Sequence, residues 1–337
     1  MDTTPSSSPR ASFVVIGLNE AERLADSIAS CMRQGLDRGE IQIIYVDSGS
    51  TDASMEIADK AGADRILELR STERNAARAR NLGLAEVEAE FVQFIDGDSS
   101  LAAGWLEDAI AALEADPRLA GAEGDLQELH PSANLYHTVC ELDWPSSSGE
   151  VTYVSGNSVY RTRAIIEAGA FDPRMQVGEE PELGVRLREK DWRFVHLDRV
   201  MAHHDLDMNG FGDWLRRGFR SGLACAMVVR ATGGWRRGFW SERLRESLAQ
   251  SAILLAPWVL CLLALPFSSG LSLAACGLGC ALIGTLVLRK ALALAGRDLS
   301  LWTRIAFGLH TYLGKIPASC GILSAYLRRL PGPVAHG

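Results

Sequence analysis

Short apolar, β-branched runs alternate with amphipathic stretches over the first 240 residues. This pattern predicts strands joined by crossover helices, and hence an α/β domain built on a largely parallel sheet. The expected strands are residues 12–17, 41–46, 65–69 and 91–95, and a further strand is expected at 193–197 and 200–202. The expected helices are residues 20–34, 51–61, 75–85 and 104–115.

A different pattern begins at Ser247, where 42 consecutive residues up to Leu288 carry no formal charge. One helix of that length would measure ~63 Å, about twice the ~30 Å hydrocarbon core of a bilayer. The sequence therefore predicts two transmembrane helices, 248–267 and 271–288, within a hairpin at 247–288 that turns where Pro, Ser and Gly cluster. The alternative, a buried hairpin of a soluble domain, fits less well because soluble helices rarely lack a polar face for so long.

Positive charges flank this hairpin on both sides, and its turn carries none. Positive residues near membrane helices stay on the cytoplasmic side. Both ends of the hairpin and the domain before it are therefore expected in the cytoplasm, and the membrane that the chain crosses twice is expected to be the inner membrane. The flanking residues are Arg236, Arg237, Arg243, Arg245, Arg289, Lys290 and Arg297.

The rest of the chain divides by composition. Residues 1–11 are rich in Ser, Pro and Thr and are expected to be a disordered tail, and the α/β domain covers 12–210. Residues 211–246 combine aromatics with Arg and are expected to lie near lipid headgroups, or to contact a diphosphate on a lipid carrier. Residues 289–337 are expected to form an interfacial or re-entrant helix and a tail, with a third crossing at 299–327 left open.

Charge and cysteine content exclude some classes of function. The net charge of −8 is unevenly distributed, because residues 241–337 hold nine Lys or Arg against three Asp or Glu and the rest carries −14. An acidic first part argues against a nucleic-acid partner, which needs a basic footprint. Seven cysteines without a CxxC pair indicate neither a disulfide framework nor a zinc site.

Three polar clusters follow predicted strands, and the carboxyl ends of parallel strands are where α/β sheets bind ligands. They are Asn19-Glu20, the run from Asp47 through Ser48 to Asp52, and Asp96-Gly97-Asp98. Asp and Ser are also ordinary turn and N-cap residues, so a purely structural role for Asp47 stays open. The two carboxylates of Asp96 and Asp98 follow an apolar strand and suit Mg²⁺ or Mn²⁺ bridging a diphosphate, with a solvated acidic turn as the alternative.

The segments FVVIGLNE, YVDSGSTD, ARNLGL and FIDGD, in this order and spacing, resemble the donor half of family 2 glycosyltransferases of the GT-A (nucleotide-diphospho-sugar transferase) fold. The resemblance continues through SGNSVYRTRAIIEAGAFDP at 155–173 and GEEPELGVRLREKDWRF at 178–194. It therefore covers roughly residues 12–205.

On the donor side, the resemblance implies that Asp47 contacts the nucleotide base and that Arg80 helps to hold the nucleotide. Asn19, Glu20 and Ser48 would belong to the same nucleotide-sugar pocket.

The resemblance also implies a metal site. Asp96 would approach the ribose or the metal, and Asp98 would coordinate the metal on the diphosphate. His203 or His204 is a candidate for a further ligand, with a hydrogen-bonded structural histidine as the alternative.

The catalytic base of the family is the Asp of a Glu-Asp pair, whereas this chain has Glu179-Glu180 after Gly178. Glu180 occupies the Asp position and is the predicted base, with Glu179 orienting it or binding acceptor. The alternative is that both acids only begin the helix expected at 181–190.

The resemblance implies an inverting, metal-dependent hexosyltransferase. The expected donor is a nucleotide-diphospho-sugar, and the expected acceptor is a membrane-carried saccharide linked to polyprenyl diphosphate, in exopolysaccharide or envelope glycan synthesis. The sequence lacks the QxxRW motif of processive synthases, which favours the addition of one sugar. The alternatives are a polyprenyl-phosphate sugar synthase, a catalytically idle scaffold with this fold, or a soluble nucleotide-binding regulator.

Overall fold

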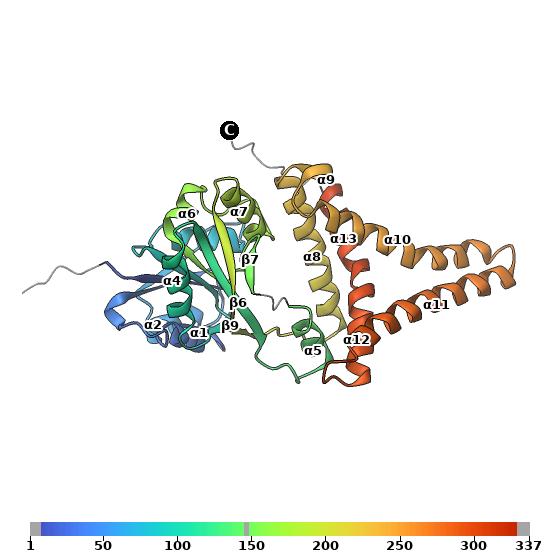
Figure 1. Ribbon diagram of the computed structural model, residues 1–337, viewed down its shortest axis with the longest axis horizontal. Helices are drawn as coiled ribbons and strands as arrows, with labels where there is room; N and C mark the ends of the chain where they lie inside the picture. The colour runs from blue at the N-terminus through green and yellow to red at the C-terminus, as the bar shows by residue number, and fades with distance from the viewer. Residues whose placement is uncertain (1–7, 145–147, 329–337) are drawn as a thin grey trace, which may run out of the picture. The chain divides into compact units, whose positions relative to one another are not determined.

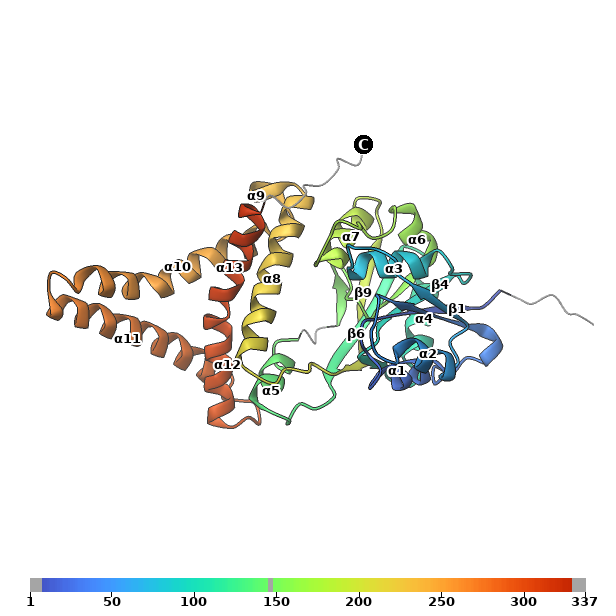
Figure 2. The same cartoon turned by 180° about the vertical axis from the view of Figure 1, so that it is seen from behind.

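The computed structural model describes residues 8–144 and 148–328 and separates into two compact units, each of which can be followed in Figures 1 and 2. Unit 1 holds the described residues of Met1–Leu129 and Trp144–Leu206, and unit 2 holds those of His130–Asp143 and Asp207–Gly337. Of the α/β domain expected at 12–210, residues 130–143 and 207–210 belong to unit 2. Residues 1–7 of the expected tail lie outside the described residues, and Ala11 already belongs to the first strand.

Unit 1 is built on a nine-stranded sheet in the order β3-β2-β1-β4-β8-β6-β9-β5, with β7 paired to β9. The strands are β1 Ala11–Gly17, β2 Ile41–Asp47, β3 Arg65–Glu68, β4 Phe91–Asp96, β5 Ser99–Leu101, β6 Leu119–Glu128, β7 Gly149–Val151, β8 Val159–Arg161 and β9 Arg193–His204. The helices are α1 Leu24–Cys31, α2 Ser54–Lys60, α3 Ala76–Leu84, α4 Trp105–Ala115, α6 Thr162–Glu167 and α7 Glu179–Arg188, with a short 3₁₀ turn at Arg38–Glu40.

The predicted α/β class and the predicted strands are confirmed, but the sheet is mixed. Strands β3, β2, β1 and β4 run parallel because a helix returns the chain between them. The short strands β8, β5 and β7 pair antiparallel with their neighbours. The two pieces expected at 193–197 and 200–202 form the single strand β9.

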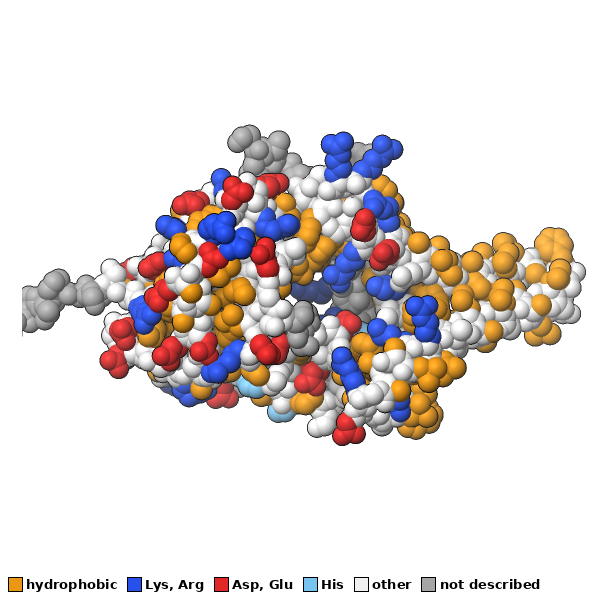
Figure 3. All heavy atoms as spheres, in the orientation of Figure 1, with side chains coloured by type: hydrophobic (Ala, Val, Ile, Leu, Met, Phe, Trp, Pro, Cys, Tyr) orange, Lys and Arg blue, Asp and Glu red, His pale blue; other side chains and the backbone are white. Residues whose placement is uncertain are grey.

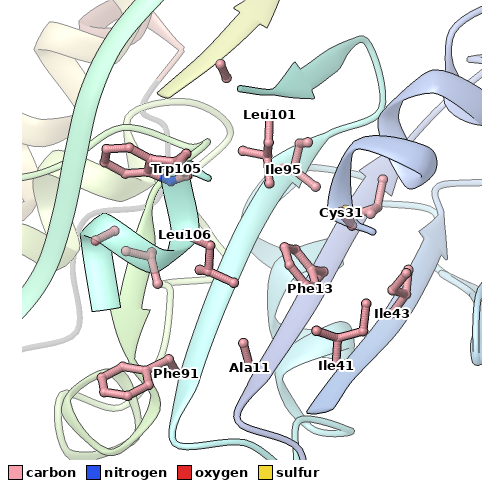
Figure 4. Packing of buried hydrophobic residues seen from close by; sticks show 14 of the residues in the cluster. Ala11, Phe13, Cys31, Ile41, Ile43, Phe91, Ile95, Leu101, Trp105 and Leu106 are labelled. Atoms are coloured by element: carbon pink, nitrogen blue, oxygen red, sulfur yellow. The ribbon is translucent and has the colours of Figure 1, made fainter. Parts of the chain in front are cut away.

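The two faces of the sheet are buried by different helices, because successive side chains of a strand point to opposite faces. Phe13 and Ile43 face α1, α2 and α4, and Figure 4 shows them with Trp105 and Leu106 in that layer. Val14 and Ile44 face α3, α6 and α7. The indole of Trp105 donates to the buried Gln93 side chain at 2.9 Å, so its polar atom is satisfied inside the core.

Unit 2 is helical. Its helices are α5 Leu135–Glu141, α8 Phe211–Ala231, α9 Gly234–Arg237, α10 Ser241–Ala264, α11 Ser269–Ala293, α12 Leu301–Leu313 and α13 Lys315–Leu327. The predicted hairpin is confirmed as α10 and α11, and both helices are long and apolar enough to cross a membrane. Many large apolar side chains of the hairpin are exposed, including Leu262, Phe267 and Leu273 at 69%, 88% and 72%.

The apolar segment expected as one interfacial helix at 299–327 forms two helices of 13 residues, α12 and α13. Each is ~20 Å long, too short to span a ~30 Å core alone. Helix α13 packs on α8, where Gly222 lies against the backbone of Ala318 and Gly321 against the carbonyl of Phe219. Packing inside unit 2 therefore buries one side of α13, including Ile322 and Ala325. Residues 329–337 of the expected tail lie outside the described residues.

Candidate active site

The parallel register brings the three polar clusters to one edge of the sheet, as the sequence predicts. Gly17 of β1 pairs with Asp47 of β2, and Ile16 pairs with Asp96 of β4. Each strand ends at this level, so the loops that follow all leave from the same edge.

Asp47 is fully buried, and its carboxylate is held by its own loop. One oxygen accepts hydrogen bonds from the backbone N–H groups of Gly49 and Ser50, both at 2.7 Å, and the other accepts from the Tyr45 hydroxyl at 3.0 Å. Three donors fix the carboxylate and therefore the shape of the loop 47–52. Asp47, which the resemblance predicts to contact the nucleotide base, therefore also shapes its own loop.

Asn19 and Ser48 tie the same loop to the end of β1. Asn19 has a left-handed backbone (φ 59°), its N–H donates to the Ser50 hydroxyl at 2.8 Å, and its side-chain oxygen accepts from the Thr51 N–H at 2.8 Å. The Ser48 N–H donates to the carbonyl of Gly17 at 2.8 Å. These hydrogen bonds order the loop 47–52 before any ligand binds. The entropy cost of ordering the loop on binding is therefore small.

Arg80 links the donor side of the site to the predicted base. Its side chain is 3% exposed and donates to Glu179 at 2.6 Å, to Glu180 at 3.2 Å and to Asp96 at 3.1 Å. Its guanidinium also lies over the ring of Phe171, 5.7 Å from the centroid. The surrounding carboxylates raise the pKa of Arg80 in spite of its burial. In this structure Arg80 is paired with three carboxylates of the site, and its predicted contact with the nucleotide stays a prediction.

Glu179 and Glu180 lie in the first turn of α7, which begins at Glu179 and not at Pro181 as predicted. Pro181 still suits this turn, because its φ is fixed near the helical value and its missing N–H would have no partner there. Glu179 is buried against Arg80, whereas the Glu180 side chain is 18% exposed. Burial and the charge of Glu179 raise the pKa of Glu180 to about 7, against the opposing charge of Arg80. A carboxylate with such a pKa is suited to accept a proton near neutral pH.

The loop between β7 and β8 supplies two residues that the sequence-based list of site residues did not include. The Asn157 side-chain oxygen accepts from the Asp96 N–H at 2.8 Å, and its amide donates to the Ser99 hydroxyl at 3.3 Å. Gly156 leaves room for the site, since a Cβ there would lie 2.9 Å from Glu180 Oε1 and would collide with Arg80. The quoted SGNSVY segment contained both residues, but only the fold shows what they touch.

A second charged group surrounds Asp98. His204 Nε2 lies 3.5 Å from the Asp98 carboxylate, and the Ser99 hydroxyl donates to Asp98 at 3.2 Å. Burial opposes the ionisation of Asp98, but the hydrogen bond and charge of His204 outweigh it and lower the pKa. Of the two histidines considered, His204 therefore lies beside Asp98, and His203 faces the other side of the strand because side chains alternate.

Glu20 completes this group through Arg23. The Arg23 guanidinium lies 3.0 Å from Glu20 and 3.2 Å from Asp205, and neither Arg23 nor Asp205 was among the predicted site residues. Burial and the charge of Asp98 raise the pKa of Glu20 to about 7, although Arg23 opposes the shift. The two charged groups around Arg80 and Asp98 thus contain six carboxylates against the guanidinium groups of Arg23 and Arg80. The carboxylates are those of Glu20, Asp96, Asp98, Glu179, Glu180 and Asp205.

The donor set fits a divalent cation that arrives together with a diphosphate. Within residues 8–144 and 148–328, no three His, Cys, Asp or Glu side chains form a metal cage. Mg²⁺ at phosphate sites takes only one or two protein carboxylates and completes its shell with phosphate oxygens and water. Asp96 and Asp98 provide such a pair, and the excess of carboxylates would repel a diphosphate that came without a cation.

Fold and site together define a mixed α/β protein with a GT-A-like sheet and its polar loops at one strand edge. Residues 12–126 match the family model of glycosyl transferase family 2. The chain therefore carries a family 2 glycosyltransferase domain, as the motifs predict.

Two curated relatives extend this match. The pre-mycofactocin glycosyltransferase of Mycobacterium tuberculosis is 32% identical over 206 residues, which cover 56% of this chain and 43% of that protein. The glycosyltransferase AglE of Haloferax volcanii is 22% identical over 226 residues, covering 64% of this chain and 73% of that protein. The chain thus spans less than half the length of the Mycobacterium relative.

A solved structure shows the same fold. The mannosyltransferase PcManGT from Pyrobaculum calidifontis, in complex with GDP-Man and Mn²⁺, superposes with a TM-score of 0.59 at 20% identity. The superposition covers 95% of this chain and 88% of that protein.

Proposed function

We propose that the protein transfers one sugar, with inversion, from a nucleotide-diphospho-sugar to a membrane-carried saccharide linked to polyprenyl diphosphate. The observation that carries the proposal is the hydrogen bonding of one buried side chain, Arg80, to Asp96 on the donor side and to Glu180 on the base side. This contact supports the proposal because it brings Asp96, the proposed metal ligand, close to Glu180, the proposed base.

The donor half of the proposal rests on the loops at that edge. The preformed loop 47–52 would receive the nucleotide, with Asn19, Glu20 and Ser48 beside it. Asp96 and Asp98 would hold Mg²⁺ or Mn²⁺, which, when bound, neutralises charge on the diphosphate. His204, which touches Asp98 at 3.5 Å, replaces His203 as the histidine proposed to support this site.

The chemical step is a single displacement. Glu180 takes the proton of the acceptor hydroxyl, the hydroxyl oxygen forms a bond to the anomeric carbon, and the bond from that carbon to the diphosphate oxygen breaks. The electron pair of that bond leaves on the nucleoside diphosphate. Glu180 is suited to this role because its pKa is about 7. A carboxylate with this pKa is partly deprotonated at neutral pH and is a stronger base than an ordinary glutamate. Arg80, which is itself held by Glu179, keeps the Glu180 carboxylate in place.

The acceptor and the location are inferred from unit 2. Apolar side chains cover the α10–α11 hairpin in Figure 3, and Lys and Arg side chains gather at its base. Large exposed apolar surfaces are unfavourable in water and mark sites of contact with protein or lipid. Two helices of this length match the thickness of a bilayer, which would shield these side chains from water. We infer that the hairpin crosses the inner membrane, with unit 1 on the cytoplasmic side and the acceptor drawn from the lipid phase.

The test is a transfer assay with the full-length chain in detergent. UDP- and GDP-sugars would be offered with Mn²⁺ or Mg²⁺ and either a polyprenyl-diphosphate saccharide or polyprenyl monophosphate, and the products separated by mass. Transfer to the saccharide, lost in both Asp98→Asn and Glu180→Gln, supports the proposal. Transfer to the monophosphate alone would identify a polyprenyl-phosphate sugar synthase. Absence of transfer and of donor hydrolysis with every donor would favour the idle scaffold.

A further inference from the structure

Unit 2 contains a group of basic side chains that the proposed transfer reaction does not use. Arg217 on α8, Arg243 on α10 and Lys315 at the start of α13 form this group, which we call the cation cluster. Arg217 and Arg243 are exposed, and Lys315 is partly buried.

Close helix packing fixes the position of the cluster. Gly218, the residue after Arg217, lies against the ring of Pro317, so α8 and α13 approach each other at the level of Lys315. The Ser251 hydroxyl of α10 donates to the carbonyl of Lys315 at 2.7 Å and contacts the Ser319 hydroxyl at 2.7 Å. The three residues of the cluster therefore lie on helices α8, α10 and α13, and α13 is the common partner on which the other two pack directly.

The positive charges of the cluster are not cancelled by ion pairs. Among the described residues, no carboxylate lies within salt-bridge distance of any of its three members. The nearby carboxylate Asp143 lies 3.8 Å from His310. Burial opposes the ionisation of Asp143, but His310 and the charges of Arg217 and Lys315 together lower its pKa. Burial and the charge of Arg243 lower the pKa of Lys315, although Asp143 and Glu246 oppose the shift. Arg243 and Lys315 therefore repel each other, and the nearby carboxylates offset this charge without a direct ion pair. An anion bound at the cluster would relieve the remaining repulsion.

The depth of the cluster indicates where the anion comes from. Arg243 precedes Ser247, the first residue of the uncharged stretch, by about 6 Å along α10. That is the level of lipid headgroups if the hairpin spans the bilayer. Trp240 stacks beneath Arg243 at 5.0 Å, and aromatic rings of this kind favour the membrane interface.

We propose that the cation cluster binds the phosphate of a membrane lipid that ends in a phosphomonoester or a diphosphate. The choice follows from charge: three cations gain more from a compact group of charge about −2 or more than from a phosphodiester of charge −1. The inference rests on the proposed function only in taking the ligand to be lipid-borne.

The experiment measures lipid binding and not sugar transfer. Full-length protein in dodecyl maltoside with EDTA would be titrated with farnesyl diphosphate, dioctanoyl phosphatidic acid or dioctanoyl phosphatidylglycerol, with tryptophan fluorescence as the readout. The EDTA suppresses binding at the metal-dependent donor site, and Asp98→Asn should bind the lipids as the wild type does. The wild type is expected to bind the first two ligands about tenfold or more tightly than the diester.

Lys315→Met and Arg217→Met are each expected to weaken farnesyl diphosphate binding about tenfold, the usual loss for one charge-assisted contact. Arg297→Met removes one charge in the α11–α12 connection and should change nothing. Arg217 is exposed, so its variant tests the cluster even if Lys315→Met unfolds. Equal affinity for the diester, wild-type affinity in both cluster variants, or an equal loss in Arg297→Met would each overturn the proposal. Lipid binding without sugar transfer would refute the proposed function and leave this site standing.

Discussion

Arg80 Nη1 donates a hydrogen bond to Glu180 Oε1 across 3.2 Å, joining helix α3 to the first turn of α7. The same guanidinium reaches Asp96 at 3.1 Å, so the predicted base and the predicted metal ligand share one cation. A displacement of Arg80 would therefore change both the position and the pKa of Glu180. The first three predictions follow from this contact.

Replacing Glu180 by Gln is expected to lower the transfer rate about 10²- to 10⁴-fold while leaving the donor affinity nearly unchanged, because only proton acceptance is lost. In the wild type, Glu180 is protonated below its pKa of about 7, so the rate should fall as the pH drops through that value. The measurement is the transfer rate at saturating donor as a function of pH. A limb near 4.5, the ordinary glutamate value, would contradict the assignment.

Replacing Arg80 by Met leaves buried carboxylates without their cation. We expect a loss of about 3 kcal/mol in the free energy of unfolding, the usual result of removing one partner from a buried ion pair. We also expect the acid limb of the rate to move to higher pH, because the charge that lowers the pKa of Glu180 is gone. Denaturant unfolding and the pH profile measure the two effects. In the control Arg78→Met, which breaks a 2.8 Å pair with the exposed Glu73, stability should change by no more than about 1 kcal/mol.

Replacing Gly156 by Ala adds a Cβ where Arg80 and Glu180 lie. Because Arg80 is held by three carboxylates, its guanidinium has little freedom to move away. Transfer should drop more than about tenfold, with nucleotide binding largely kept. Gly39→Ala is the matched control, since a Cβ at Gly39 meets nothing within 4 Å. Comparable transfer by the two variants would show that this contact does not matter for activity.

Asp98 is expected to be required for metal-dependent donor binding. A bound nucleotide at about 100 times its Kd should stabilise the wild type by about 2.7 kcal/mol, and Asp98→Asn should lose the part that depends on Mn²⁺. Thermal unfolding with UDP or GDP, with and without Mn²⁺, measures the difference. Asp59→Asn, an exposed substitution on α2, serves as the control. An undiminished Mn²⁺ effect in Asp98→Asn would place the metal elsewhere.

The orientation of the hairpin is open to chemical labelling. In a variant without the seven native cysteines, Ser268→Cys at the turn should react with a membrane-impermeant maleimide added outside intact spheroplasts. Gly296→Cys, beyond the end of α11, should react only after lysis. The physical reason is that the positive flanks keep both hairpin ends inside. Labelling of both positions from outside, or of neither, would refute the proposed topology.

The sequence by itself determined the local elements and the clusters at their ends. Apolar runs such as residues 91–95 read as buried strands because burial on both faces demands apolar side chains throughout. The uncharged stretch from Ser247 to Leu288 predicted a hairpin that could lie in hydrocarbon, where charges are costly. Asp96 and Asp98 were predicted as site residues because polar residues that directly follow a strand lie where such a sheet binds ligands.

Only the tertiary structure decided which side chains meet. Arg80 and Glu180 are 100 residues apart, and their contact exists because α3 and α7 cover the same face of the sheet. Strand register placed His204 and not His203 at Asp98, a choice that a shift of one residue would reverse. Gly156 and Asn157 lie at the site because the strand that follows them, β8, pairs antiparallel with β4. No local sequence pattern predicts that pairing. Helix propensity and hydrophobic period act over a few residues, whereas these contacts depend on how distant segments pack.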